Sequence, residues 1–202
     1  MGTGNKVEML LAVCAVITSV IAVYVAWDQG RVMRAQQHGA VYPVLQVDGF
    51  VSTNARTASM GMRVGNSGVG PALIHDVRLS ADGVVLETLD AYSERLPEGY
   101  DLSWAGLAGR ALAPGEEIIP IQITWSTEDI SMDTLYATAA EWGELEMSIC
   151  YCSVFDRCWR THAIGSSRKE QVDQCEDSET DTFESLGRYA PALRPIEDTQ
   201  VD

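Results

Sequence analysis

The stretch "ICYCSVFDRCWR" at residues 149–160 holds three of the five cysteines of this chain, namely Cys150, Cys152 and Cys158. Cysteine side chains form disulfides, bind metal ions or act as nucleophiles, so these residues carry the most distinctive chemistry in the sequence. Cys175 follows them along the chain, whereas Cys14 lies in an apolar run near the N-terminus. The four downstream cysteines are therefore the first candidates for a site.

A disulfide pairing follows if the stretch forms a β-hairpin whose turn is centred on Phe155. Cys152 then lies opposite Cys158, and directly opposed Cβ atoms are ~4.5–5.5 Å apart, near the reach of a disulfide. Cys150 is left to pair with Cys175. An even set of four cysteines is typical of an oxidising compartment. We therefore predict the disulfides Cys152–Cys158 and Cys150–Cys175.

Two other states of these cysteines stay open. The four thiols could be reduced and packed as small apolar side chains in a cytoplasmic domain. They could also bind zinc, alone or with His162, but the spacing C-x-C-x5-C-x16-C lacks the C-x2-C pairs of common zinc modules. We expect no metal ion and no cofactor.

Catalytic motifs do not accompany the three histidines, His38, His75 and His162. Cys158 with His162 is a dyad that the sequence leaves open, since neighbours in space need not be neighbours in sequence. The glycines of "RVGNSGVGPALI" (63–74) do not have the spacing of a phosphate-binding loop. We therefore expect no catalytic residues, and a thiol-dependent enzyme is the third hypothesis for function.

The segment that must position these cysteines reads as an antiparallel, immunoglobulin-like β-sandwich over residues 42–175. Short runs rich in β-branched and aromatic residues alternate with turn signals, and "ADG" at 81–83 predicts a tight hairpin. Two inserts interrupt the strands. Residues 89–113 form an irregular connection in which Trp104 is a candidate interaction residue, and residues 126–144 form a helix capped by Ser126 or Ser131.

The run from Met9 to Trp27 has 19 residues without charge, Gly or Pro. A helix of that length covers roughly 28 Å, close to the ~30 Å hydrocarbon thickness of a bilayer. We predict an uncleaved transmembrane helix at 9–27 after a short tail at 1–8, with a cleaved signal peptide and a buried core helix as the other interpretations. Residues 28–41 continue as a juxtamembrane helix or linker. Small residues line one face of the span, where a partner helix could approach: Ala15, Ser19, Ala22 and Ala26.

The net charge of −15 argues against a nucleic-acid partner, which requires a basic surface. Acidic residues are concentrated toward the C-terminus. We expect residues 176–202 to form an acidic tail that is disordered unless a partner binds it.

A strand-turn motif resembles that of bacterial membrane-anchored β-sandwich proteins. The pattern N-x-G-x-G-P-A is carried by Asn66, Gly68, Gly70, Pro71 and Ala72. The likeness extends to "LAPGEEI" (112–118) and to the cysteine hairpin, and in outline it covers residues 42–164. The resemblance implies a β-sandwich and a bacterial envelope setting.

These observations favour a non-catalytic, single-pass accessory subunit of a larger membrane complex. Its partners are other membrane protein subunits, contacted through the helix and the sandwich, and no small-molecule ligand is expected. The few Lys and Arg beside the span orient it weakly, whereas the predicted disulfides favour a periplasmic domain at the bacterial inner membrane over a cytoplasmic one. An envelope ligand-binding or sensor module is the second hypothesis.

Overall fold

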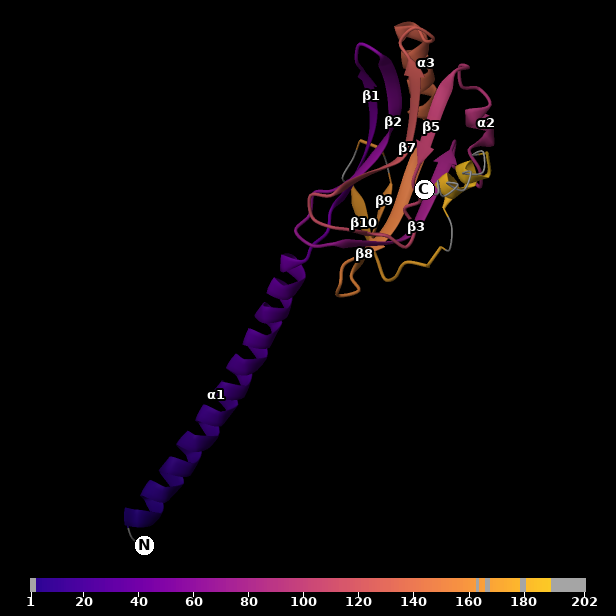
Figure 1. Ribbon diagram of the computed structural model, residues 1–202. Helices are drawn as coiled ribbons and strands as arrows, with labels where there is room; N and C mark the ends of the chain where they lie inside the picture. The colour runs from indigo at the N-terminus through magenta and orange to yellow at the C-terminus, as the bar shows by residue number, and fades with distance from the viewer. Residues whose placement is uncertain (1–2, 163, 166–167, 179–180, 190–202) are drawn as a thin grey trace, which may run out of the picture. The chain divides into compact units, whose positions relative to one another are not determined.

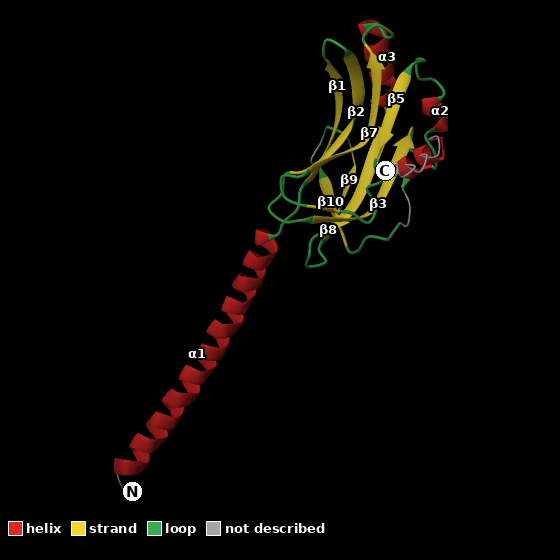
Figure 2. Ribbon diagram, viewed as in Figure 1, coloured by secondary structure: helices red, strands yellow, loops and turns green. Residues whose placement is uncertain are grey.

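The computed structural model describes residues 3–162, 164–165, 168–178 and 181–189. The chain divides into two units, Met1–Val41 and Tyr42–Asp202. Figure 1 follows the chain through both units, and Figure 2 distinguishes their helices, strands and loops.

The first unit is a single helix, α1 (Thr3–Ala40). The predicted span 9–27 and the predicted linker 28–41 are one continuous helix, which also includes part of the expected tail at 1–8. Gly30 does not interrupt it, because one glycine inside a helix costs only about 1 kcal/mol. The segment Glu8–Ala40 is long and apolar enough to cross a membrane, and none of its most apolar window is buried.

The second unit consists of two antiparallel sheets. The first has the order β1 (Leu45–Thr53), β2 (Thr57–Asn66), β7 (Glu117–Ser126) and β5 (Tyr100–Trp104). The second has the order β10 (Lys169–Val172), β9 (Cys158–His162), β8 (Glu146–Cys152), β3 (Ala72–Ala81) and β4 (Val84–Leu86), with β6 (Ala111–Leu112) paired to β3. The prediction of a mainly β, antiparallel fold after an apolar helix is confirmed.

One hydrophobic core takes side chains from both sheets. Burial alternates along β2, where Met60, Met62 and Val64 point inward, and β7 contributes Ile123 and Trp125. Burying one such side chain contributes roughly 1.5–3 kcal/mol, so this alternation fixes which face of each strand is internal.

The predicted hairpin turns are confirmed. Asp82 and Gly83 have φ values of 50° and 76°, as a two-residue turn between β3 and β4 requires. Cys152 pairs with Cys158 across β8 and β9, so the second turn is centred on Phe155.

The segment 126–144 contains the expected helix, α3 (Met132–Trp142), and its cap is Ser131 rather than Ser126. The Ser131 hydroxyl accepts a hydrogen bond from the amide of Thr134 at 3.1 Å. Leu135 and Trp142 are buried, so α3 packs against the core through this face.

The prediction of an irregular connection at 89–113 is wrong in part. The segment contains the short helix α2 (Asp90–Ser93) and the strands β5 and β6. Its leucines anchor it, because Leu89, Leu107 and Leu112 are almost completely buried. These strands have only five and two residues, which is too short for a clear alternating pattern.

The prediction that the sandwich ends at residue 175 and an acidic tail begins at residue 176 is also wrong. The 3-10 helix η1 (Thr182–Tyr189) belongs to the folded unit, because Phe183 and Leu186 are buried in the common core. Their spacing of three residues matches the three-residue turn of a 3-10 helix, which places both side chains on one face. The rest of the predicted tail, residues 190–202, lies outside the described residues.

Candidate functional site

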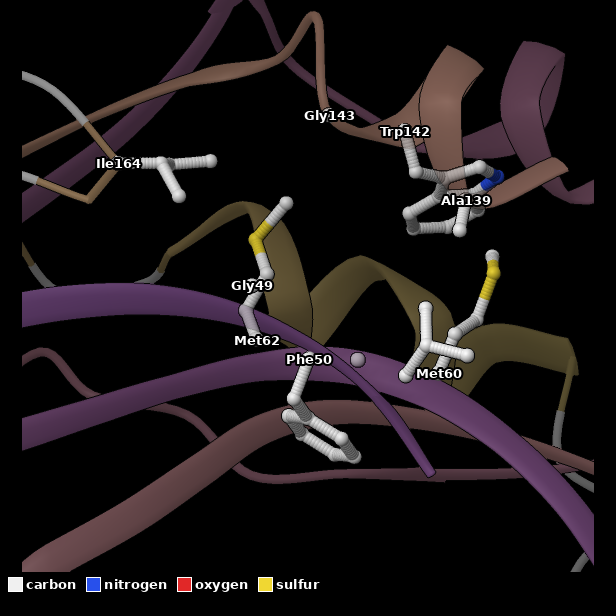
Figure 3. Close-up of a pocket in the computed structure, with 10 residues that line it drawn as sticks. Gly49, Phe50, Met60, Met62, Ala139, Trp142, Gly143 and Ile164 are labelled. Carbon is white, nitrogen blue, oxygen red and sulfur yellow. The ribbon is translucent and has the colours of Figure 1, made fainter. Parts of the chain in front are cut away.

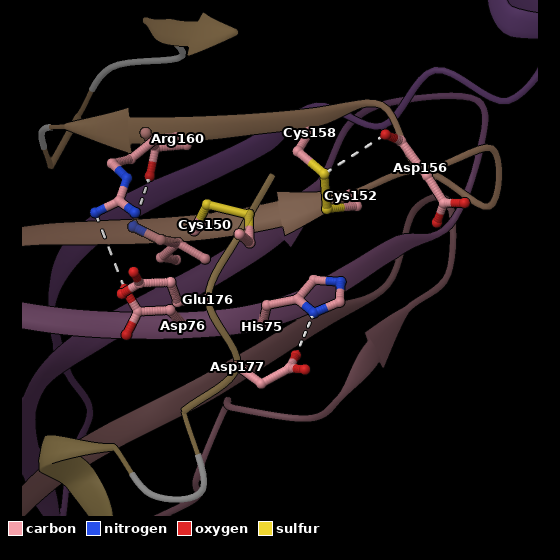
Figure 4. Close-up of a disulfide and its surroundings, with 12 residues drawn as sticks. His75, Asp76, Cys150, Cys152, Asp156, Cys158, Arg160, Glu176 and Asp177 are labelled. Atoms are coloured by element: carbon pink, nitrogen blue, oxygen red, sulfur yellow. Dashed lines mark hydrogen bonds and ion pairs between the residues drawn. A yellow bond between two sulfur atoms is a disulfide. The ribbon is translucent and has the colours of Figure 1, made fainter. Parts of the chain in front are cut away.

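The structure contains two disulfides, and they join the pairs expected from the sequence. Cys150 is bonded to Cys175 and Cys152 to Cys158. Cys150 and Cys152 point away from the core, because the alternate residues Ile149 and Tyr151 point into it. Both disulfides therefore lie on the outer face of the second sheet (Figure 4).

The sulfur atoms of Cys152, Cys158 and Cys175 lie within 4.8 Å of one another. As disulfides they have no thiolate to offer a metal ion. The dyad of Cys158 and His162 is not formed either, since the Cys158 sulfur is bonded to Cys152 and the His162 Nε2 lies 3.6 Å from Glu170. The disulfide is therefore a structural cross-link between the two strands of the hairpin.

The Cys150–Cys175 bond holds a segment that we call the C-terminal strap, residues 173–178. His75 Nδ1 lies 2.6 Å from the carboxylate of Asp177, and the Ser178 amide donates to the His75 carbonyl at 2.9 Å. Arg78 lies 3.8 Å from Glu176. The strap thus crosses the outer face of β3 and β8 and leads into η1.

A polar hollow of about 500 Å³ lies beside the strap, and several carboxylates line it. The two most buried of these already have partners. Asp76 is 3.0 Å from Arg78 and 3.9 Å from Arg160. Asp181 accepts hydrogen bonds from four backbone amides, those of Leu107, Ala108, Phe183 and Glu184. These carboxylates therefore hold the strap and η1 in place.

The N-x-G-x-G-P-A motif forms the turn that carries the chain from β2 in one sheet to β3 in the other. Asn66 is buried, and its side chain accepts from the amides of Val44 and Gly68 and donates to the carbonyls of Gly70 and Leu112.

Asn66, Gly68 and Gly70 are not among the residues with positive φ, so this turn does not use the left-handed conformation that glycine favours. Gly68 is required for another reason. A Cβ atom there would lie 2.4 Å from the Tyr42 carbonyl oxygen and 2.5 Å from the Val44 nitrogen, so a larger residue cannot fit. Pro71 then leads the chain into β3, and the motif is structural.

Trp104 lies at the end of a strand and not in an irregular loop, while its candidate role in an interaction stays a prediction. It ends strand β5 opposite Ile121 of β7, and it is partly buried against the core. A side chain that packs against its own domain is a weaker candidate for a binding hot spot than an exposed one.

The four small residues of the predicted packing face are exposed, as are the large apolar residues of α1 from Met9 to Met33. Ala15, Ser19, Ala22 and Ala26 share one helix face by their spacing. The Ser19 hydroxyl donates to the Ala15 carbonyl at 2.7 Å, so it is satisfied within the helix. This face offers a shallow surface without an unpaired hydroxyl.

An apolar cleft that the sequence did not indicate lies between the inner face of β1 and β2 and the end of α3. Its volume is about 150 Å³, and Met60, Met62, Trp142 and Ile164 form its walls (Figure 3). Gly49 lies at an inward position of β1, between Val47 and Val51, and leaves the cleft open at the sheet edge. A glycine at an inward position of an alternating strand was the signal that could have revealed it.

Among the described residues, Tyr151 is the one whose pKa is strongly shifted. Its side chain is fully buried, and burial raises its pKa to about 12, while the backbone of Leu45 acts in the opposite direction. Its hydroxyl forms no hydrogen bond of normal geometry with the described residues. It faces the core, away from the disulfides and the polar hollow, so it offers no acid or base to a site.

An exposed apolar helix followed by a disulfide-linked β-sandwich fits a membrane-anchored domain in an oxidising compartment. The chain belongs to the family described as Domain of unknown function (DUF8453), whose sequence model matches residues 9–170. The match begins inside the apolar segment and ends in β10, so it includes helix and sheets but stops before the strap and η1. The chain matches no curated protein.

Proposed function

We propose that this protein is a non-catalytic, single-pass accessory subunit of a larger membrane complex. The observation that carries the proposal is α1, whose large apolar side chains from Met9 to Met33 are exposed and have no partner in the described chain. Lipid or other membrane helices can cover such a surface. The four cysteines that a thiol-dependent enzyme could use outside the apolar segment are held in disulfides.

The disulfides support a domain on the oxidising side, which is the periplasm if the membrane is a bacterial inner membrane. Two disulfides linking β8 to β9 and to the strap would be short-lived among cytoplasmic reductants. The net charge of −15 supports a protein partner over a nucleic acid.

The end of the sandwich at which the chain leaves α1 has features that suit a membrane surface. Tyr42, the first residue of the sandwich, packs against Trp159 at 5.0 Å and beneath the Lys169 ammonium at 4.0 Å. Val69 in the β2–β3 turn and Phe155 in the β8–β9 turn belong to this end and are 65% and 47% exposed. Exposed apolar tips at the end of a domain that is joined to a membrane-spanning segment favour contact with the headgroup region.

Copurification in a mild detergent tests the proposal. The full chain should resist carbonate extraction, keep its N-terminal segment and carry other membrane proteins at fixed stoichiometry. Substituting Ala15→Leu and Ala22→Leu should release these partners by blocking close helix approach. The matched control is Val13→Leu with Val20→Leu on the opposite helix face. Release of the chain by carbonate, a mature N-terminus near residue 27, or purification without partners would contradict the proposal.

A further inference from the structure

The sheet edges of the sandwich differ in how they are protected. An open edge strand exposes backbone groups that can pair with another chain, and proteins usually shorten, charge or cover such edges. The β10 and β4 edges have four and three residues, and β5 contacts η1. In contrast, β1 has nine residues, and its second half, "GFVST" (49–53), contains neither charge nor proline. Among the described strands, β1 is the least protected.

The backbone groups on the open side of β1 can be assigned by alternation. The Val47 carbonyl accepts a hydrogen bond from the Gly165 amide at 2.6 Å, although Gly165 is not part of the β1–β2 pair. Val47 therefore directs its backbone away from β2, and so do Gly49, Val51 and Thr53. In the part of the chain that the structure describes, no hydrogen bond to these three residues crosses this edge. Among the described residues, the open segment therefore starts at Gly49.

The apolar cleft lies directly behind this open segment. In a strand added beside β1, the side chain opposite Gly49 points toward the same inner face, with its Cβ ~4.5–5.5 Å from that position. It would enter the space between Met60, Met62 and Trp142 (Figure 3). A cleft of about 150 Å³ without a charged lining residue suits one aliphatic side chain.

Two acidic residues flank the cleft, and one basic residue, Arg63 of β2, lies opposite the first of them and is 3.7 Å from Glu117. Asp48 precedes Gly49 on β1, and Glu144 follows the α3 wall at Gly143; neither has an ion pair within the described chain. The whole chain carries a net charge of −15. A strand that docks here is therefore favoured by Lys or Arg at its outward positions.

We propose that β1 and this cleft form a binding site for an extended, basic segment of a partner protein, which adds a strand to β1 and inserts one aliphatic side chain beside Gly49. Main-chain pairing supplies affinity and the cleft supplies selectivity, as in other strand-addition complexes. This site specifies the chemistry of a partner for the proposed accessory subunit. The inference therefore rests on the proposed function.

A direct test uses the full chain in detergent and a capped eight-residue peptide of alternating lysine and valine, with leucine at one central apolar position. We expect saturable binding by fluorescence anisotropy and slower hydrogen exchange in residues 45–53. N-methylation of the apolar residues, whose amides would face β1, should abolish binding, whereas N-methylation of the lysines should not. A glutamate version of the peptide should bind at least tenfold more weakly.

The decisive variant is Gly49→Leu, which fills the cleft from inside. A Cβ atom at Gly49 would meet only the Ile164 side chain, at 4.0 Å, so the substitution is compatible with folding. It should weaken peptide binding at least tenfold. Gly65→Leu on the outer face of β2 is the matched control, because its Cβ would contact only the Glu117 side chain, at 3.4 Å or more. Thermal unfolding checks that both variants are folded.

Three results would overturn the site: equal peptide binding by the Gly49→Leu variant, indifference to N-methylation, or unchanged exchange in β1. Self-association that Gly49→Leu abolishes would assign β1 to a second copy of this chain and would also contradict the proposed partner. A failure of the proposed accessory role can be distinguished from a failure of the site. In that case the chain purifies without partner proteins, although it still binds the peptide. If the Gly49→Leu variant no longer binds the peptide but still copurifies with the partner proteins, those partners do not bind at this site. The proposed accessory role would be unaffected by that result.

Discussion

Asn66 shows how one polar residue can determine the path of the chain between the two sheets. Its buried amide group satisfies two backbone donors and two backbone acceptors, including the distant Leu112 carbonyl. We expect Asn66→Ala to lower the free energy of unfolding by roughly 2–4 kcal/mol, because buried backbone groups lose their partners. Ser67→Ala, at an exposed neighbour, should change it by less than ~0.5 kcal/mol in the same denaturant titration. Equal effects would contradict this role.

Tyr151 gives a prediction for alkaline pH. Its pKa is about 12 in the folded chain against 10.0 for an ordinary tyrosine, so above pH 10 the unfolded chain loses this proton while the folded chain keeps it. The stabilisation is complete below pH 10 and is lost as pH rises toward 12, by roughly 2–3 kcal/mol. Tyr151→Phe should remove this part of the decline in urea unfolding series. Parallel pH profiles for the two proteins would contradict the assignment.

At the scale of elements, the strap and η1 complete the sandwich from outside the region that the family model matches. Phe183 is fully buried, so Phe183→Ala should cost about 3–5 kcal/mol. The same substitution at the half-exposed Phe155 should cost much less. Denaturant unfolding of both variants is the measurement, and similar losses would show that η1 is not part of the cooperative unit.

The two disulfides should differ in their contributions because they close loops of different length. The bonded residues are 25 apart in Cys150–Cys175 and 6 apart in Cys152–Cys158. Loop-closure entropy then predicts losses of about 3.5 and about 2 kcal/mol when each pair is replaced by serine. Chemical unfolding of the two double variants tests the order. A larger loss for the short loop would mean that native packing, not the unfolded chain, dominates.

At the scale of the whole molecule, the number of free thiols reports the compartment. The unreduced, denatured chain should show one reactive thiol, Cys14, because the other four cysteines are in disulfides. Five thiols in protein isolated from cells with rapid alkylation would contradict an oxidising location. A count after full reduction is the control and should give five.

Local patterns in the sequence determined much of this protein. The uninterrupted apolar run specifies a helix, alternation specifies the strands, and "ADG" and the spacing of Cys152 and Cys158 about Phe155 specify two turns, because each depends on residues close in sequence. The pairing of Cys150 with Cys175 followed only by elimination.

The tertiary structure decided what depends on residues far apart. Phe183 and Leu186 look like part of an acidic tail until the contact of η1 with β5 and the core is known. Trp104 looks exposed until its strand is paired with β7. The cleft forms where β1, β2 and the end of α3, which are far apart in sequence, enclose a common space beside Gly49. Periodicity gives the face on which a side chain lies, whereas the packing of distant elements determines what covers that face and what remains open.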